Sequence, residues 1–63
     1  MSLKSIRQAR GLSQAELARR SGVHWVKINQ IESGKIDPSN MSLKNAARLA
    51  DALDVDPREF LKN

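Results

Sequence analysis

The sequence predicts an all-α fold of five helices. Apolar residues recur at helical spacing, and no segment alternates apolar and polar residues with a period of two. Glycines at positions 11, 22 and 34 and prolines at positions 38 and 57 separate the helical segments. The 63 residues contain no internal repeat and no low-complexity tract. We therefore expect a single domain over residues 1–63.

The first helix is expected over about residues 2–10, with Ser2 as its N-cap. Gly11 follows, because glycine readily adopts the left-handed conformation just beyond a helix end. The apolar face predicted for this helix consists of Leu3, Ile6 and Ala9.

Two further helices joined by a tight turn are predicted over residues 13–33. Ser13 and Glu16 have the spacing of a capping box, which marks the start of the second helix. Gly22 makes the turn. Ala18 and Gly22 are one helical turn apart, and these two small residues predict the close approach of a neighbouring helix. The third helix is expected from about His24 to Ser33, with an apolar face of Val23, Ile28 and Ile31.

The last two helices follow a loop over residues 35–41, which contains Asp37-Pro38-Ser39-Asn40. The fourth helix is expected over about residues 42–54, and Asp56-Pro57 then begins a short fifth helix that ends near Leu61. The apolar residues assigned to these two helices are Leu43, Ala46, Ala47, Ala50 and Leu53, then Phe60 and Leu61.

Composition excludes several classes of site. The chain has no cysteine, which excludes disulfides and thiolate metal sites, and its single histidine argues against a metal centre. No cofactor is expected. No apolar run approaches membrane-spanning length and no signal peptide is visible, so we expect a cytoplasmic protein. Catalysis is not expected, because the carboxylates Asp51, Asp54, Asp56 and Glu59 have no nucleophile–base pair beside them.

Positive charge is concentrated in the first half of the chain. Residues 1–36 carry seven basic and two acidic groups, a net of +5, whereas residues 37–63 carry four basic and five acidic groups, a net of −1. This asymmetry predicts a polyanionic partner, and a solubilising surface is the alternative.

The third helix hides its aliphatic residues and displays hydrogen-bonding side chains. A helix of this kind is suited to reading base edges in the DNA major groove. An alternative is that Trp25 packs against a protein partner, since tryptophan is enriched at interfaces. The residues left to face outward are His24, Trp25, Lys27, Asn29 and Gln30.

Three runs carry a family resemblance: Arg7-x-x-x-Gly11-Leu12-Ser13-Gln14-x-x-Leu17-Ala18-x-x-x-Gly22-Val23, then Ile28-x-x-x-Glu32-x-Gly34, and finally Leu49-Ala50-x-Ala52-Leu53-x-Val55 with Phe60-Leu61. They resemble the lambda/434 phage-repressor-like helix-turn-helix domains, also called the xenobiotic-response-element type. The resemblance covers essentially the whole chain. It implies a DNA-binding domain whose helix-turn-helix is formed by the second and third helices, bound as a dimer to two half-sites.

The resemblance also implies residue roles. Trp25, Val26 and Gln30, with Asn29 beside them, fall where relatives read bases. Arg7 and Glu32 match a structural salt bridge. A dimer contact is expected near Pro57 and Arg58. The positions expected to contact phosphates are Ser13, Gln14, Lys27, Ser33, Lys35 and Asn40.

Two departures from the family pattern change the expected contacts. Tryptophan cannot pair bidentately with a base, so Trp25 and Val26 are expected to touch thymine methyl groups while Gln30 hydrogen-bonds an adenine. Asp37 stands where some relatives have a basic residue, which shifts loop contacts to Lys35 and to amides near Asn40.

These observations predict a bacterial or phage transcriptional regulator, most simply a repressor, that binds double-stranded DNA as a weak homodimer. One alternative is an antitoxin or restriction-modification controller that regulates its own promoter. Another is a protein-interaction module that uses the face around Trp25.

Overall fold

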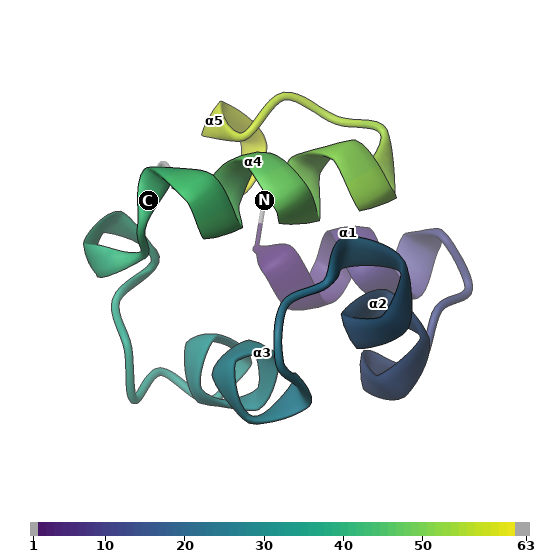
Figure 1. Cartoon of the computed structure of the whole chain (residues 1–63), viewed down its shortest axis with the longest axis horizontal. Coiled ribbons are helices and arrows are strands. Elements are labelled where there is room, and N and C mark those ends of the chain that lie inside the picture. Colours follow the sequence, from purple (N-terminus) through teal and green to yellow (C-terminus); the bar gives the residue numbers. More distant parts are fainter. Residues whose placement is uncertain (1, 62–63) are drawn as a thin grey trace.

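The computed structural model describes residues 2–61, and within that range it contains helices and no strand. The predicted all-α fold is confirmed. The α4 helix packs on α2, while α3 packs on both α1 and α2 (Figure 1). The α5 helix folds back to contact α1 and η1. The elements in order are α1 (Leu3–Ala9), α2 (Gln14–Ser21), α3 (Trp25–Glu32), the 3₁₀ helix η1 (Pro38–Asn40), α4 (Leu43–Leu53) and α5 (Arg58–Leu61).

Serine hydroxyls set three of the helix starts. Ser13 Oγ accepts the amide of Glu16 at 3.0 Å, and Glu16 Oε1 accepts the amide of Ser13 at 3.1 Å, which completes the predicted capping box. The hydrogen bond that the Ser13 amide donates lowers the pKa of the Glu16 carboxyl. Ser2 caps α1 with the same reciprocal arrangement, and Ser42 Oγ accepts the amide of Asn45 at the start of α4. The predicted helix starts are therefore confirmed.

Gly22 is required for backbone conformation and not for close packing. Its φ of +75° lies in the left-handed region, where it ends α2 and turns the chain toward α3. A Cβ placed on Gly22 would meet nothing within 4 Å. The predicted close approach of a helix at Gly22 was wrong, because the turn itself demands the glycine.

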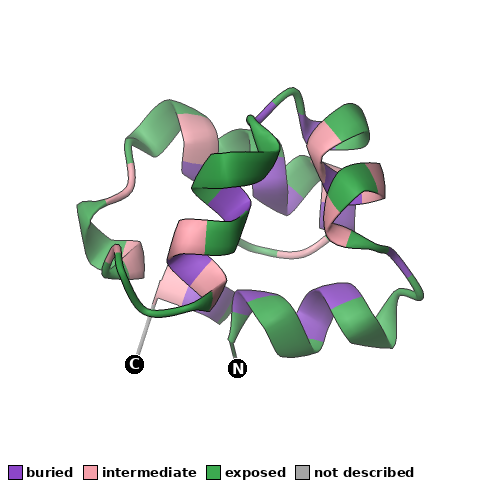
Figure 2. Cartoon of the chain, turned by 90° about the horizontal axis from the view of Figure 1, so that it is seen from below, coloured by how far each residue is buried: buried purple, intermediate pink, exposed green. Residues whose placement is uncertain are grey.

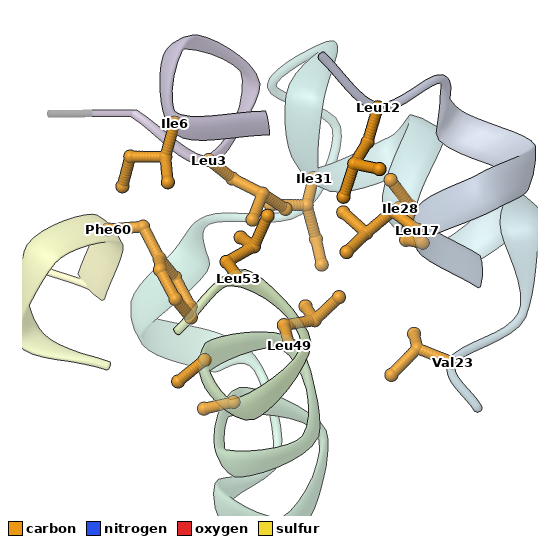
Figure 3. Close-up of a cluster of buried hydrophobic side chains, with 12 residues drawn as sticks. Leu3, Ile6, Leu12, Leu17, Val23, Ile28, Ile31, Leu49, Leu53 and Phe60 are labelled. Carbon is orange, nitrogen blue, oxygen red and sulfur yellow. The ribbon is translucent and has the colours of Figure 1, made fainter. Parts of the chain in front are cut away.

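The core lies where α4 meets the other helices. Leu49 and Leu53 of α4, Leu17 of α2, Ile28 of α3 and Phe60 of α5 are the largest fully buried side chains (Figure 3). In Figure 2 the buried positions of each helix face the interior, whereas exposed positions cover its outer side. The core thus fixes α3 from behind and leaves its outer face free.

The predicted apolar stripe of α4 was partly wrong. Leu43 is 82% exposed and Ala47 is exposed, whereas Leu49 is fully buried. The buried stripe follows the helical spacing of Ala46, Leu49, Ala50 and Leu53, which leaves Leu43 and Ala47 at its edge.

Smaller differences occur at two other helices. On α1, Ala9 is exposed, whereas Arg7 is buried and forms an ion pair with Glu32. On α5, Phe60 is buried as predicted while Leu61 is only half-buried.

The segment predicted as a loop over residues 35–41 contains η1. Asp37 caps η1: its Oδ1 accepts the amide of Ser39 at 2.9 Å and the hydroxyl of Ser39 at 2.8 Å. These hydrogen bonds lower the pKa of Asp37. Pro38 at the first position suits this short helix, because its missing N–H has no partner to lose there.

None of the helices between residues 2 and 61 has both the length and the apolar character that crossing a membrane requires.

Candidate nucleic-acid interface

The outer face of α3 presents a continuous set of accessible side chains. Trp25 is 48% exposed and Val26 is 43% exposed, and both belong to the first turn. Asn29, one turn later, is also exposed, and Gln30 is half-buried. The predicted base-reading residues therefore share one surface, which we call the α3 face (Trp25, Val26, Asn29 and Gln30).

The His24 side chain caps the start of this helix. Its Nδ1 accepts the backbone amide of Val26 at 3.1 Å, so the imidazole is the N-cap of α3. The cap fixes where the first turn begins and therefore how Trp25 and Val26 are presented.

A buried ion pair joins α1 to the end of α3. Arg7 Nε lies 2.7 Å from Glu32 Oε2, and Arg7 Nη2 lies 3.0 Å from Glu32 Oε1. Arg7 Nη1 donates to the carbonyl of Leu12 at 2.7 Å. The Arg7 and Glu32 side chains are 11% and 3% exposed. The hydrogen bond to Glu32 raises the pKa of Arg7, outweighing the burial that would lower it.

Gln14 extends this ion pair toward the α3 face. It is the first residue of α2, and its Nε2 donates to Glu32 Oε1 at 3.0 Å. Its Oε1 accepts Asn29 Nδ2 at 3.3 Å. Sequence reasoning assigned Gln14 to a phosphate and Asn29 to a base and did not foresee their contact, because the hydrogen bonds join helices that only tertiary packing brings together.

A first hollow, of about 290 Å³, opens beside these residues. Ser33 and Lys4 line it together with Gln14, the first residue of α2, and the first amides of a helix have no intrahelical partner. Lys4 was missed by sequence reasoning, although it stands one turn before Arg7 on α1. The lining residues are Lys4, Arg7, Gln14, Asn29, Glu32 and Ser33.

A second hollow, of about 240 Å³, lies between α3 and the start of α4. It brings together Lys27 and Asn40, two of the predicted phosphate contacts, and adds Asn45, which the sequence did not suggest. Ile31, Ile36 and Met41 form its apolar part. The exposed side chain of Lys35 lies on the connecting segment. Polar groups thus occur on both sides of the α3 face.

The residues predicted for a dimer contact lie at the start of α5. Arg58 is largely exposed and pairs with Asp56 within the same chain, with Arg58 Nη2 3.0 Å from Asp56 Oδ2. Asp56 Oδ1 also accepts the amide of Arg58 at 2.9 Å, and these hydrogen bonds lower the pKa of Asp56. Pro57 is half-buried. A third hollow, of about 290 Å³, is lined by Ile6, Ala9, Arg10, Val55 and Glu59.

Residues 3–60 match the family model described as "Helix-turn-helix". The chain belongs to the helix-turn-helix family. The match runs from the start of α1 to Phe60 in α5, with α2 and α3 as the helix-turn-helix pair. It is of the xenobiotic-response-element, lambda-repressor-like type that the sequence resembles.

Two proteins illustrate the relationship. The "Uncharacterized HTH-type transcriptional regulator y4dL" of Sinorhizobium fredii is 43% identical over 49 residues, which are 78% of this chain and 25% of that protein. This chain therefore spans about a quarter of that relative's length. The crystal structure of the restriction-modification controller protein C.AhdI from Aeromonas hydrophila is 44% identical, with a TM-score of 0.80. The match covers 90% of this chain and 82% of C.AhdI. The family and both relatives support a DNA-binding regulator.

Proposed function

We propose that this helix-turn-helix protein is a sequence-specific repressor that inserts α3 into the DNA major groove as one half of a homodimer. The observation that carries the proposal is the division of α3 into two sides. Ile28 and Ile31 anchor it in the core, while Trp25, Val26 and Asn29 remain exposed on the outer face. The major groove is wide enough to admit such a helix.

The base contacts follow from the chemistry of the α3 face. Trp25 offers an apolar ring and one indole N–H, and Val26 offers methyl groups, so both suit the methyl group of thymine. Gln30 offers a donor and an acceptor, which suit the N7 and N6 positions of adenine. An A·T-rich half-site is the expected target.

The phosphate contacts come from the hollows on the two sides of α3. The first hollow offers Gln14, at the start of α2, and Ser33, and Ser13 directly precedes Gln14 as the N-cap of α2. The second hollow offers Lys27 and Asn40, and Lys35 lies on the segment after α3. Helix N-termini and ammonium groups attract anions. If about eight phosphates are contacted, affinity should fall about 10³–10⁵-fold between 50 and 200 mM salt.

Dimerisation is assigned to the surface around Pro57 and Arg58. The third hollow supports this assignment, because it is lined by Glu59, the residue after Arg58, together with the apolar Ile6 and Val55 and the oppositely charged Arg10. A twofold axis would bring opposite charges of two copies together. The two α3 helices would then enter half-sites about 34–36 Å apart.

The similarity to a restriction-modification controller favours a second form of the same activity, in which the protein regulates its own promoter. Binding to the DNA upstream of its own gene, competed against unrelated promoters, separates this form from a repressor that acts elsewhere.

The test of the proposed function is in-vitro selection from a randomised duplex library at fixed moderate salt, with wild type, Trp25→Ala and Trp25→Phe in parallel. Wild type should enrich a palindromic consensus, and Trp25→Ala should lose the preference at one base pair of each half-site. Trp25→Phe should keep much of that preference, because it retains an aromatic ring. Weak, salt-sensitive retention without enrichment would refute the proposal and direct the search to a protein partner of Trp25.

A further inference from the structure

We propose that the buried Glu32 carboxylate, acting through Gln14, fixes the orientation of the Asn29 amide, so that Asn29 is a pre-oriented adenine reader. The inference rests on the proposed function and adds to it a positioning role for a salt bridge that otherwise only joins α1 to α3. It derives from three consecutive hydrogen bonds that link Arg7, Glu32, Gln14 and Asn29.

The Glu32 carboxylate restricts which side chain can join it. Arg7 is a permanent donor, and its Nε and Nη2 occupy both carboxylate oxygens of Glu32. The third contact of Arg7, from Nη1 to the carbonyl of Leu12, holds the guanidinium in place. An ionised carboxylate only accepts hydrogen bonds, so a side chain that joins this pair must present a donor.

Glu32 determines the orientation of the Gln14 amide. Its amide can satisfy Glu32 Oε1 only through Nε2, as observed at 3.0 Å. Because an amide is planar, the carbonyl oxygen then lies on the other side, where it accepts Asn29 Nδ2 at 3.3 Å. A flipped Gln14 would set its oxygen against a carboxylate and its NH₂ against a second NH₂. The ion pair therefore selects one of the two amide orientations.

Asn29 keeps one hydrogen-bond donor and one acceptor for DNA. One of its two N–H groups is used by Gln14, which leaves one N–H and the carbonyl oxygen on an exposed side chain of the α3 face. Adenine presents an acceptor at N7 and a donor at N6 in the major groove. Asn29 thus keeps the complementary pair, and its orientation is set before DNA binds, which reduces the entropy lost on binding.

Gln14→Met is the central test, because methionine has a similar length and helix propensity but no amide, and it leaves the Arg7–Glu32 pair intact. In selections and in binding titrations against single-base variants of the consensus, Gln14→Met should weaken the preference for adenine at one base pair about three- to tenfold. Asn29→Ala should weaken the preference at the same base pair, and the two changes together should cost less than the product of their separate effects.

Lys35→Met is the matched control. It removes a proposed phosphate contact outside the network and should lower affinity by a similar factor for every base at that position. If Gln14→Met behaves like Lys35→Met, Gln14 only holds a phosphate and the inference is wrong. It is also wrong if wild type selects a consensus but Asn29→Ala changes no base preference, although the proposed function then stands.

A measurement on the free protein separates the inference from DNA binding. In nuclear magnetic resonance spectra without DNA, one Asn29 amide proton should be protected and shifted by its bond to Gln14. Gln14→Met should bring the two proton shifts closer together, while circular dichroism shows an unchanged fold. Equal shifts in wild type and Gln14→Met would overturn the inference, whatever DNA the protein selects.

Discussion

Replacing Arg7 with methionine is expected to abolish most of the folding stability. The substitution keeps an aliphatic side chain but removes all three hydrogen bonds of the guanidinium, two to Glu32 and one to the carbonyl of Leu12. The Glu32 side chain, 3% exposed, would keep Gln14 as its remaining partner and lose its counter-charge. The variant would therefore leave a buried carboxylate without its ion-pair partner.

The magnitude follows from the burial of this pair. Removing one partner of a buried ion pair costs about 3–5 kcal/mol. A domain of this size has a net stability of only about 3–5 kcal/mol. The expected loss equals the whole free energy of unfolding, so Arg7→Met should be largely unfolded at room temperature even without denaturant.

Urea titrations followed by far-ultraviolet circular dichroism provide the measurement. Arg58→Met is the matched control, because it makes the same substitution in an ion pair whose side chains are 86% and 47% exposed. Solvent screens an exposed pair of this kind, which therefore contributes little to stability, so this control should fold nearly as well as wild type. The double variant Arg7→Met with Glu32→Met should recover stability, because no buried charge remains. Equal urea midpoints for Arg7→Met and Arg58→Met would refute the reasoning.

Three further outcomes are expected. Gly22→Ala should cost about 1–2 kcal/mol in thermal unfolding, because alanine is strained at a φ of +75° although its Cβ meets no neighbour; an unchanged midpoint would show that the turn adapts. Leu49→Ala should cost about 2–5 kcal/mol and Leu43→Ala less than about 0.5 kcal/mol, and equal losses would contradict the packing of α4. Hydrogen bonds lower the pKa values of Asp37 and Asp56, so the unfolded chain binds protons first on acidification. The stability that these two carboxylates contribute to the folded state is therefore present above about pH 4 and is lost as the pH falls through their lower folded pKa values. Melting temperatures should fall over that pH range, and they should fall less steeply for Asp37→Asn than for wild type.

The helix boundaries could be predicted because their signals are local. Ser13 and Glu16 are three residues apart, and Gly22 ends α2 through its own backbone conformation. The start of α3 near His24 was predictable for the same reason, since the His24 side chain caps the helix that begins with the next residue. Each of these signals acts within one turn of helix, so no tertiary information was needed.

The phase of the apolar face and the polar network could not be predicted in the same way. Periodicity shows that α4 has an apolar stripe, but packing decides that Leu49 enters the core and Leu43 does not. Gln14 and Glu32 are 18 residues apart in sequence, and the sequence around each of them alone would predict a surface side chain. The pairing of Arg7 with Glu32 was anticipated only because the family resemblance implied it.

The exposure of Trp25 has a practical consequence. It is the chain's single tryptophan and is nearly half accessible in the folded protein. Its fluorescence should therefore change little on unfolding but strongly when bases stack or pack against the indole. The chain thus carries its own optical reporter of contacts at the α3 face, and circular dichroism on the same sample then separates loss of binding from loss of fold without any label.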